Sequence, residues 1–487
     1  MNAKKSKKFI FFGVVIAAFF VLLGIIRLIQ GDMDSSERIQ SGDIPLWLCL
    51  PFVGMLLCIA VFPLVNGELW EKVKPYAVAV WSILFLVPFA IMYGSSAALE
   101  QLLESIIGDY LTFIVLLFGL FCVAGNITLK GDLLGSPKTN IVLLLIGTVL
   151  SSWIGTTGAS MLMIRPLLRA NRWRRKKVQI VVFFIFLVSN IGGCLTPIGD
   201  PPLLMGFTRG VPFTWSLRLV KVLLLNVILL LAIFYVIDSI AYKKDIRAGL
   251  KPNTEGKKEP IRLEGAHNII FLLMIVAAVI ISGVIPAKYA VPIYGEVTFK
   301  LSAIVEIVII LAAAFLSFKT TNKRVRNNNH FTWDAIQEVA VLFVGIFITM
   351  IPALLFLKAK GSELGLTQPW QMFWVTGALS SFLDNTPTYL VFFTTAGTLG
   401  ATSGISTTVG TIGVVMLEAI SCGAVFMGAN TYIGNAPNFM VKSIAEENGV
   451  KMPSFFGYML WSISSLIPVF LVDMLVFFNP WTGGFLF

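Results

Sequence analysis

The sequence predicts an all-α polytopic membrane protein with about eleven transmembrane helices, two re-entrant hairpins and two broken helices, arranged as an inverted repeat. Three observations predict this class: the composition, the spacing of the apolar stretches and a motif that occurs twice. Of the 487 residues 57% are hydrophobic and only 13% are charged, and the mean hydropathy is +0.85. Such a composition cannot supply an ordinary water-facing surface, so the lipid bilayer is the expected partner.

Most apolar stretches are close to the roughly 20 residues that a helix needs to cross a bilayer. The first, 9–29, follows a basic N-terminus, and a cleaved signal peptide is the rival interpretation. Its apolar run is longer than that of a signal peptide and no A-x-A site follows, so we favour an uncleaved helix. The other predicted spans are 45–65, 76–94, 110–129, 178–207, 218–241, 268–285, 300–317, 335–357, 410–441 and 456–478.

Two further apolar stretches, 139–168 and 370–397, are interrupted in the middle by polar residues. The interruptions read Gly155-Thr156-Thr157-Gly158 and Asp384-Asn385-Thr386-Pro387. Each arm is predicted to be too short to span the bilayer. Because unpaired backbone groups are tolerated at membrane depth only where they face protein or water, we expect two re-entrant hairpins.

The net charge of +11 comes from Lys and Arg in the loops between apolar spans. When the N-terminus is placed in the cytoplasm and the spans alternate, about 28 of the 37 Lys and Arg fall inside, including the basic loop 169–177. We therefore expect a multi-pass protein of the cell inner (plasma) membrane with a cytoplasmic N-terminus and no nucleic-acid partner. The two hairpins then enter from opposite faces, which suits alternating access better than an open channel.

The chain is predicted to contain two related halves. The segment 1–44 holds the N-terminal tail, the extra helix and an external loop. The two repeats are predicted at 45–242 and 267–487, and a cytoplasmic linker at 243–266 joins them. The motif Thr-x-Ile-Gly-Asp/Asn-x-Pro occurs in both halves, and the two hairpin tips align, with Gly155 matched to Asp384. Transporters built from inverted repeats bind substrates and ions at such breaks.

The breaks and tips carry oxygen-bearing side chains, which are the ligands that a hard cation such as sodium prefers. Two carboxylates are asymmetric between the halves, because Asp200 corresponds to Asn435 and Asp384 corresponds to Gly155. We predict that Asp200 and Asp384 bind sodium and protons. The neutral side chains predicted to join them are Asn190, Thr196, Asn385, Thr386, Asn430, Thr431 and Asn435; secondary candidates are Thr157, Gly199, Gly434, Asn438, Glu418 and Glu338.

A carboxylate near the centre of a span costs roughly 2.5–3.5 kcal/mol, so its presence needs a reason. Burial favours the protonated carboxyl and a bound cation favours the ionised one, so sodium and protons are expected to compete. A simple helix cap is the alternative interpretation of Asp384, because Asp, Asn and Thr are good N-caps. The acids Glu306, Asp238 and Asp473 lie on spans near the repeat ends or in the predicted scaffold, and a structural role is expected for them.

Three segments, 189–207 (SNIGGCLTPIGDPPLLMGF), 380–393 (SSFLDNTPTYLVFF) and 423–459, resemble the ion transporter superfamily. The resemblance is closest to NhaD-type sodium/proton antiporters and their citrate-transport relatives, and covers roughly 45–478. It implies a scaffold domain, a transport domain built from the hairpins and broken helices, and a homodimer formed through the scaffold. Members move sodium, protons, carboxylates, citrate complexes or arsenite, so the fold does not name the cargo. Carboxylate transporters of this kind carry Ser-Asn-Thr at both tips, and the tips here differ.

The sequence thus favours a secondary active transporter that exchanges sodium for protons, with sodium as the transported or coupling ion and no other cofactor. The alternative is a sodium- or proton-coupled citrate or carboxylate transporter. An enzyme is not expected: Asp384 has no preceding Tyr and no Gly-x-Gly-Asp motif, as an intramembrane aspartyl protease would require. The chain also has no phosphate-binding glycine-rich loop with Lys.

Overall fold

The computed structural model describes residues 39, 43–131, 133–251, 260, 262–286, 288–329 and 331–479. Within these ranges nine helices are long and apolar enough to cross a membrane, and two shorter apolar helices cover Asn268–Val284 and Val414–Asn430. The predicted class, an all-α polytopic membrane protein, is confirmed. The predicted span 9–29 lies outside the described residues.

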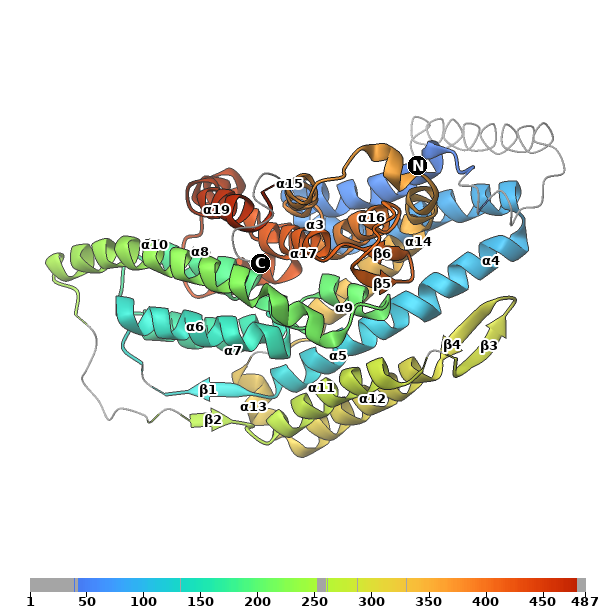
Figure 1. Ribbon diagram of the computed structural model, residues 1–487. Helices are drawn as coiled ribbons and strands as arrows, with labels where there is room; N and C mark the ends of the chain where they lie inside the picture. Colours follow the sequence, from blue (N-terminus) through green and yellow to red (C-terminus); the bar gives the residue numbers. More distant parts are fainter. Residues whose placement is uncertain are drawn as a thin grey trace, which may run out of the picture. The chain divides into compact units, whose positions relative to one another are not determined.

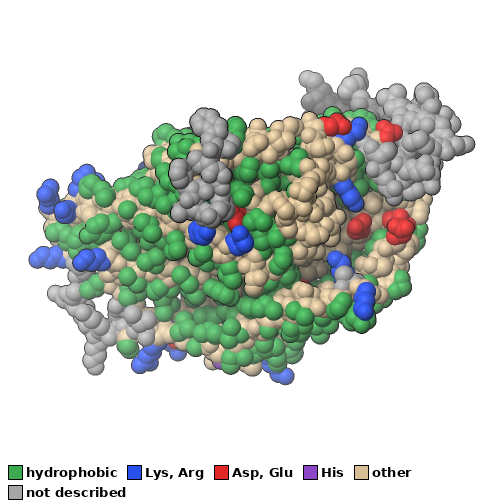
Figure 2. Space-filling view, viewed as in Figure 1, with side chains coloured by type: hydrophobic (Ala, Val, Ile, Leu, Met, Phe, Trp, Pro, Cys, Tyr) green, Lys and Arg blue, Asp and Glu red, His purple; other side chains and the backbone are tan. Residues whose placement is uncertain are grey.

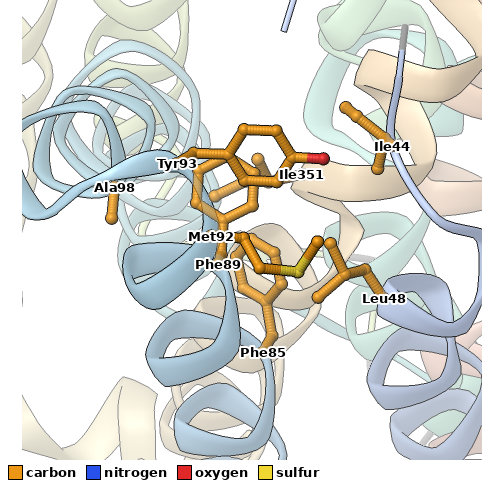
Figure 3. Close-up of a cluster of buried hydrophobic side chains, with 8 residues drawn as sticks. All are labelled: Ile44, Leu48, Phe85, Phe89, Met92, Tyr93, Ala98 and Ile351. Carbon is orange, nitrogen blue, oxygen red and sulfur yellow. The ribbon is translucent and has the colours of Figure 1, made fainter. Parts of the chain in front are cut away.

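The described residues divide into two compact units. The first unit contains the residues up to Tyr110, together with 292–298 and 341–361. Its helices are η1 (Leu46–Cys49), α3 (Leu50–Tyr93), α4 (Ser95–Leu103), the π-helix η2 (Glu104–Tyr110) and most of α14 (Asp334–Lys360). Figure 3 shows part of its core, in which the rings of Phe85, Phe89 and Tyr93 gather with Leu48 and Ile351.

Helix α3 contains two predicted spans, 45–65 and 76–94, joined by a kink at Asn66. Asn66 has a non-helical backbone, with φ −156° and ψ 87°. Its Oδ1 accepts a hydrogen bond from the backbone N–H of Leu69 at 3.0 Å, as an N-cap does. The kink therefore separates one helix into two segments, each of which begins with its own cap or turn.

The second unit comprises 111–291, 299–340 and the described residues from 362 onward. Elements β3 (Ala290–Tyr294), β4 (Val297–Lys300), α14 and η5 (Gly361–Leu364) run from one unit into the other. The remaining elements of the second unit are α5 (Leu111–Gly125), β1 (Thr128–Lys130), α6 (Pro137–Ile154), α7 (Thr156–Ala170), α8 (Val178–Leu187), η3 (Ile191–Leu195), α9 (Pro201–Thr208), η4 (Phe213–Leu219), α10 (Val220–Arg247), β2 (Arg262–Glu264), α11 (Asn268–Val284), α12 (Leu301–Thr320), α13 (Lys323–Asn328), α15 (Pro369–Ser380), α16 (Asn385–Gly397), β5 (Ile405–Thr407), β6 (Gly410–Ile412), α17 (Val414–Met427), η6 (Gly428–Asn430), α18 (Ala436–Glu447) and α19 (Phe455–Phe477).

Both predicted hairpins and both predicted broken helices lie in this unit. Helices α6 and α7 lie side by side and turn at Gly155, where φ is +78°, and α15 and α16 turn just before Asp384 (Figure 1). The first broken helix consists of α8, η3 and α9, and the second of α17, η6 and α18. The short strands form antiparallel pairs such as β1 with β2.

One expectation about the hairpins is wrong: not every arm is too short to cross a membrane. Helix α6 has 18 residues and is long and apolar enough for a crossing. The reason is its cap, because Ser136 Oγ accepts from Thr139 N at 3.2 Å and starts the helix at Pro137, two residues before the predicted arm. The other arms, α7, α15 and α16, have 15, 12 and 13 residues.

The surface of the helices suits a lipid environment. Figure 2 shows hydrophobic side chains over much of the visible face. Large apolar side chains are exposed on many spans, among them Val65 and Val284, each 77% exposed. In water such a surface would favour aggregation, whereas lipid acyl chains cover it without cost. The chain is thus a multi-pass membrane protein.

Candidate functional site

Glycine residues allow the two breaks to fold against neighbouring backbone. A Cβ at Gly199 would lie 2.2 Å from the carbonyl oxygen of Gly193, and a Cβ at Gly434 would lie 2.6 Å from that of Gly428. These distances leave no room for any side chain. The repeated Ile-Gly pair therefore marks the point where each break passes closest to its own preceding turn.

The breaks are tied to the hairpins by matching hydrogen bonds. The hydroxyl of Thr196 donates to the carbonyl of Ser152, and the hydroxyl of Thr431 donates to the carbonyl of Ser381. Both threonines were predicted to bind a cation, and that role stays a prediction. Ser151 Oγ and Ser380 Oγ also each donate to a carbonyl of the adjacent broken helix at 2.6 Å. The two halves thus make equivalent local contacts.

Asp200 lies where both hairpin tips meet the first break. It is the N-cap residue of α9 and is only 1% exposed. Its Oδ1 accepts from Thr156 Oγ1 at 3.0 Å, and its Oδ2 accepts from Asn385 Nδ2 at 3.0 Å. Thr156 and Asn385 occupy aligned positions of the two tips. The Asp200 carboxylate therefore links the start of α9 to the first tip through Thr156 and to the second tip through Asn385.

The two broken helices also contact each other through amide side chains. Asn190 Nδ2 donates to Asn438 Oδ1 at 2.7 Å, and Asn435 Nδ2 donates to Asn190 Oδ1 at 3.1 Å. Asn435 also lies close enough to Asp200 to interact with it. The structure thus brings Asp200, Asn190, Asn385, Asn435 and Asn438 into one buried polar cluster, which we call the tip cluster.

Asp384 has a capping geometry and also lies near Asp200. Its Oδ1 accepts from the backbone N–H of Thr386 at 3.0 Å, so it caps α16. It also lies within electrostatic reach of Asp200. The structure therefore shows the cap, and cation binding by Asp384 stays a prediction.

The other candidates are placed as follows. Thr386 Oγ1 and Asn430 Oδ1 are buried and have no hydrogen-bond partner among the described residues, so each offers a spare oxygen. Glu418 instead pairs with Arg218, with Oε1 and Nε 3.3 Å apart. Glu338 lies partly buried in α14, and Thr157 lies beside Thr156 at the first tip.

Sequence reasoning missed Thr156, which contacts Asp200 directly. It named the neighbouring Thr157 instead. The signal was available, because Thr156 aligns with Asn385, which was predicted. Among the described residues there is no group of three or more His, Cys, Asp or Glu side chains that could hold a metal ion, so a sodium site here would depend largely on neutral oxygens.

The apolar helices thus carry two hairpins, and the tips of these hairpins meet in the tip cluster. A sequence model of the family described as "Putative citrate transport" matches residues 40–478. The chain belongs to this family. Among curated proteins none matches the chain. The predicted citrate-transport relationship is confirmed, whereas the closer relationship to NhaD-type antiporters stays a prediction.

Replacing Gly199 with Ala is expected to destabilise the second unit, because the new methyl group would meet backbone that cannot move aside. Overpacking of this kind costs about 1–3 kcal/mol. Gly67→Ala is the control, because a Cβ there has nothing within 4 Å. Thermal unfolding of the purified variants checks this. Equal midpoints for the two variants would show that the break tolerates a side chain.

Proposed function

We propose that the protein is a sodium/proton antiporter in which Asp200 binds either a sodium ion or a proton. The observation that supports this most is the environment of the Asp200 carboxylate, which is buried and hydrogen-bonded to the neutral side chains of Thr156 and Asn385. A buried carboxylate without a cationic partner is costly. A bound sodium ion or a proton removes that cost, and the two exclude each other.

Exchange follows from this competition. At one face of the membrane protons displace sodium from Asp200, and at the other face sodium displaces protons. The hydroxyl oxygen of Thr156 and the spare oxygens of Thr386 and Asn430 are hard ligands that could complete a sodium shell. Asp384 adds a second negative charge nearby, which favours a cation in the tip cluster.

A sodium- or proton-coupled carboxylate transporter is the second candidate, and the family description favours it. Four helices, α7, α9, α16 and α18, begin at residues of the two tips and two breaks, and helix N-termini attract anions. Asp200 itself, however, is an anion at this position. Citrate would meet that charge unless the carboxyl were protonated or a metal ion accompanied the substrate, so we favour the cation.

Everted membrane vesicles that contain the protein separate the two candidates. After respiration has acidified the vesicle interior, added sodium should collapse the pH gradient if the protein is an antiporter. Vesicles from cells without the protein supply the background. Absence of a sodium response, together with uptake of labelled citrate by cells that express the protein, would reject the antiporter in favour of the second candidate.

Asp384→Asn is expected to weaken sodium binding without unfolding α16. Asn caps a helix about as well as Asp, so the substitution removes the charge and keeps the cap. The sodium concentration that gives half of the vesicle response should rise several-fold, where tenfold corresponds to about 1.4 kcal/mol. An unchanged response with unchanged thermal stability would assign Asp384 to capping alone.

We further propose the inverted repeat with halves 45–242 and 267–487, a homodimer, and an inner-membrane orientation with a cytoplasmic N-terminus. The equivalent contacts made by Thr196 and Thr431 support the repeat. The dimer is supported by the family resemblance, and the orientation by the distribution of Lys and Arg.

A further inference from the structure

A second buried acid, Asp473 on α19, contacts the closing helix of the other half. Asp473 and Asn226 of α10 are each 0% exposed. Asn226 Nδ2 lies 2.9 Å from Asp473 Oδ1 and 2.8 Å from Oδ2. Neither residue belongs to the tip cluster, and sequence reasoning expected only a structural role for Asp473.

The amide of Asn226 has one atom unsatisfied. Its Oδ1 is buried and has no hydrogen-bond partner among the described residues. Flipping the amide does not solve this. Nδ2 also donates to the carbonyl oxygen of Val222 at 2.8 Å, and a flip would place the amide oxygen against that carbonyl oxygen. An ionised Asp473 offers only acceptors and cannot serve another oxygen. The missing element is a hydrogen-bond donor to Oδ1.

We propose that Asp473 binds a proton, which its hydroxyl donates to Asn226 Oδ1 while Asn226 Nδ2 donates to the other carboxyl oxygen. The proton comes from water and no other bond changes. This cyclic acid–amide pair satisfies Oδ1 and leaves no charge between the two closing helices. It is a proton-binding site separate from Asp200, and it does not depend on which cargo the protein carries.

Among the described residues no positive charge lies close enough to Asp473 to favour the ionised acid, although the packed helix α10 carries Lys221, Lys243, Lys244 and Arg247 elsewhere along its length. The thiols of Cys194 and Cys422 interact with it electrostatically, and both are buried. Helix α8 and the short helix η6 also pack on α19, and neither contains a titratable side chain. Helix α10 presents Asn226 to it.

Another buried Asp in the same unit supplies the contrast. Asp238 of α10 is also 0% exposed, but its Oδ1 lies 2.8 Å from Nη1 of Arg174. A carboxyl that faces a guanidinium is stabilised in its ionised form. The two acids are equally buried but differ in their partners, because Asp238 faces a guanidinium and Asp473 faces an amide.

Infrared spectroscopy of the full-length protein in detergent at neutral pH tests the proposal. Asp473→Asn should remove one carbonyl band of a protonated carboxylic acid, and the new amide can form the same two hydrogen bonds with Asn226, so the fold should persist. Asp238→Asn is the control and should remove carboxylate absorption instead. Loss of a carboxylate band in Asp473→Asn would overturn the proposal.

Asn226→Leu keeps the test decisive even if Asp473→Asn does not fold. The variant removes both hydrogen bonds from the acid, so one protonated-acid band of the wild-type spectrum should shift to a higher frequency, as the carbonyl of a free acid does. If the infrared spectrum of Asn226→Leu matched that of the wild type in the region of protonated carboxylic acids, the cyclic pair would be contradicted.

Discussion

Asp200→Asn is expected to abolish sodium/proton exchange while leaving the protein folded. Asn has the same shape, and its Oδ1 can accept from Asn385 Nδ2 while its Nδ2 donates to the hydroxyl oxygen of Thr156, so the junction of the two tips should survive. What disappears is the carboxylate at which, in the proposed mechanism, a proton and a sodium ion replace each other. Losing one partner of a buried charge pair costs about 3–5 kcal/mol. That loss corresponds to a decrease of about a hundredfold or more in cation affinity.

The control for this variant is Asp200→Glu, which keeps the charge and displaces it by one methylene group. We expect reduced exchange that still responds to sodium, because the carboxylate remains but its contacts with Thr156 and Asn385 change. The sodium response of everted vesicles measures both variants. Exchange at the wild-type rate in Asp200→Asn would remove Asp200 from the mechanism.

Arg174→Ala is expected to have the largest effect on stability. Arg174 is 2% exposed and lies within ion-pair distance of two buried acids, with Nη1 2.8 Å from Asp238 Oδ1 and Nε 3.4 Å from Asp245 Oδ2. Gln179 and Asn140 also donate to Asp238, at 2.8 and 3.0 Å. Without the guanidinium two buried carboxylates lack their cation, at a cost of about 3–5 kcal/mol.

Glu446→Ala supplies the comparison, because Glu446 forms an exposed pair with Lys442 one helical turn away, with Oε2 and Nζ 3.2 Å apart. Such pairs contribute about 0.3–0.5 kcal/mol. The thermal midpoints of the purified variants should therefore differ strongly. If Arg174→Ala were as stable as Glu446→Ala, the buried network would not hold α10 to the loop before α8.

The parts of the fold that repeat along the chain could be predicted from the sequence. Gly and Pro at matching places indicated the broken helices, and the mismatch of Asp200 with Asn435 pointed to the centre of the tip cluster. Both signals are local, because a glycine or an unpaired acid is unusual in an apolar stretch wherever its partners lie.

Pairings between distant segments could not be predicted in the same way. Arg174 lies in a basic loop that suited a solvated cytoplasmic position, yet it is buried against Asp238, which comes 64 residues later. Asn226 and Asp473 are 247 residues apart and meet only once α10 packs on α19. No spacing rule connects such residues, because tertiary packing alone sets which helix faces meet.

Proton release on sodium binding is the most direct test of competition at Asp200. Sodium chloride is added to the purified protein in a weakly buffered solution, and the pH is compared with that after addition of choline chloride. If sodium and a proton share Asp200, the wild-type protein releases protons on sodium addition and Asp200→Asn releases none. No release from the wild type, or equal release from the variant, would contradict the shared site.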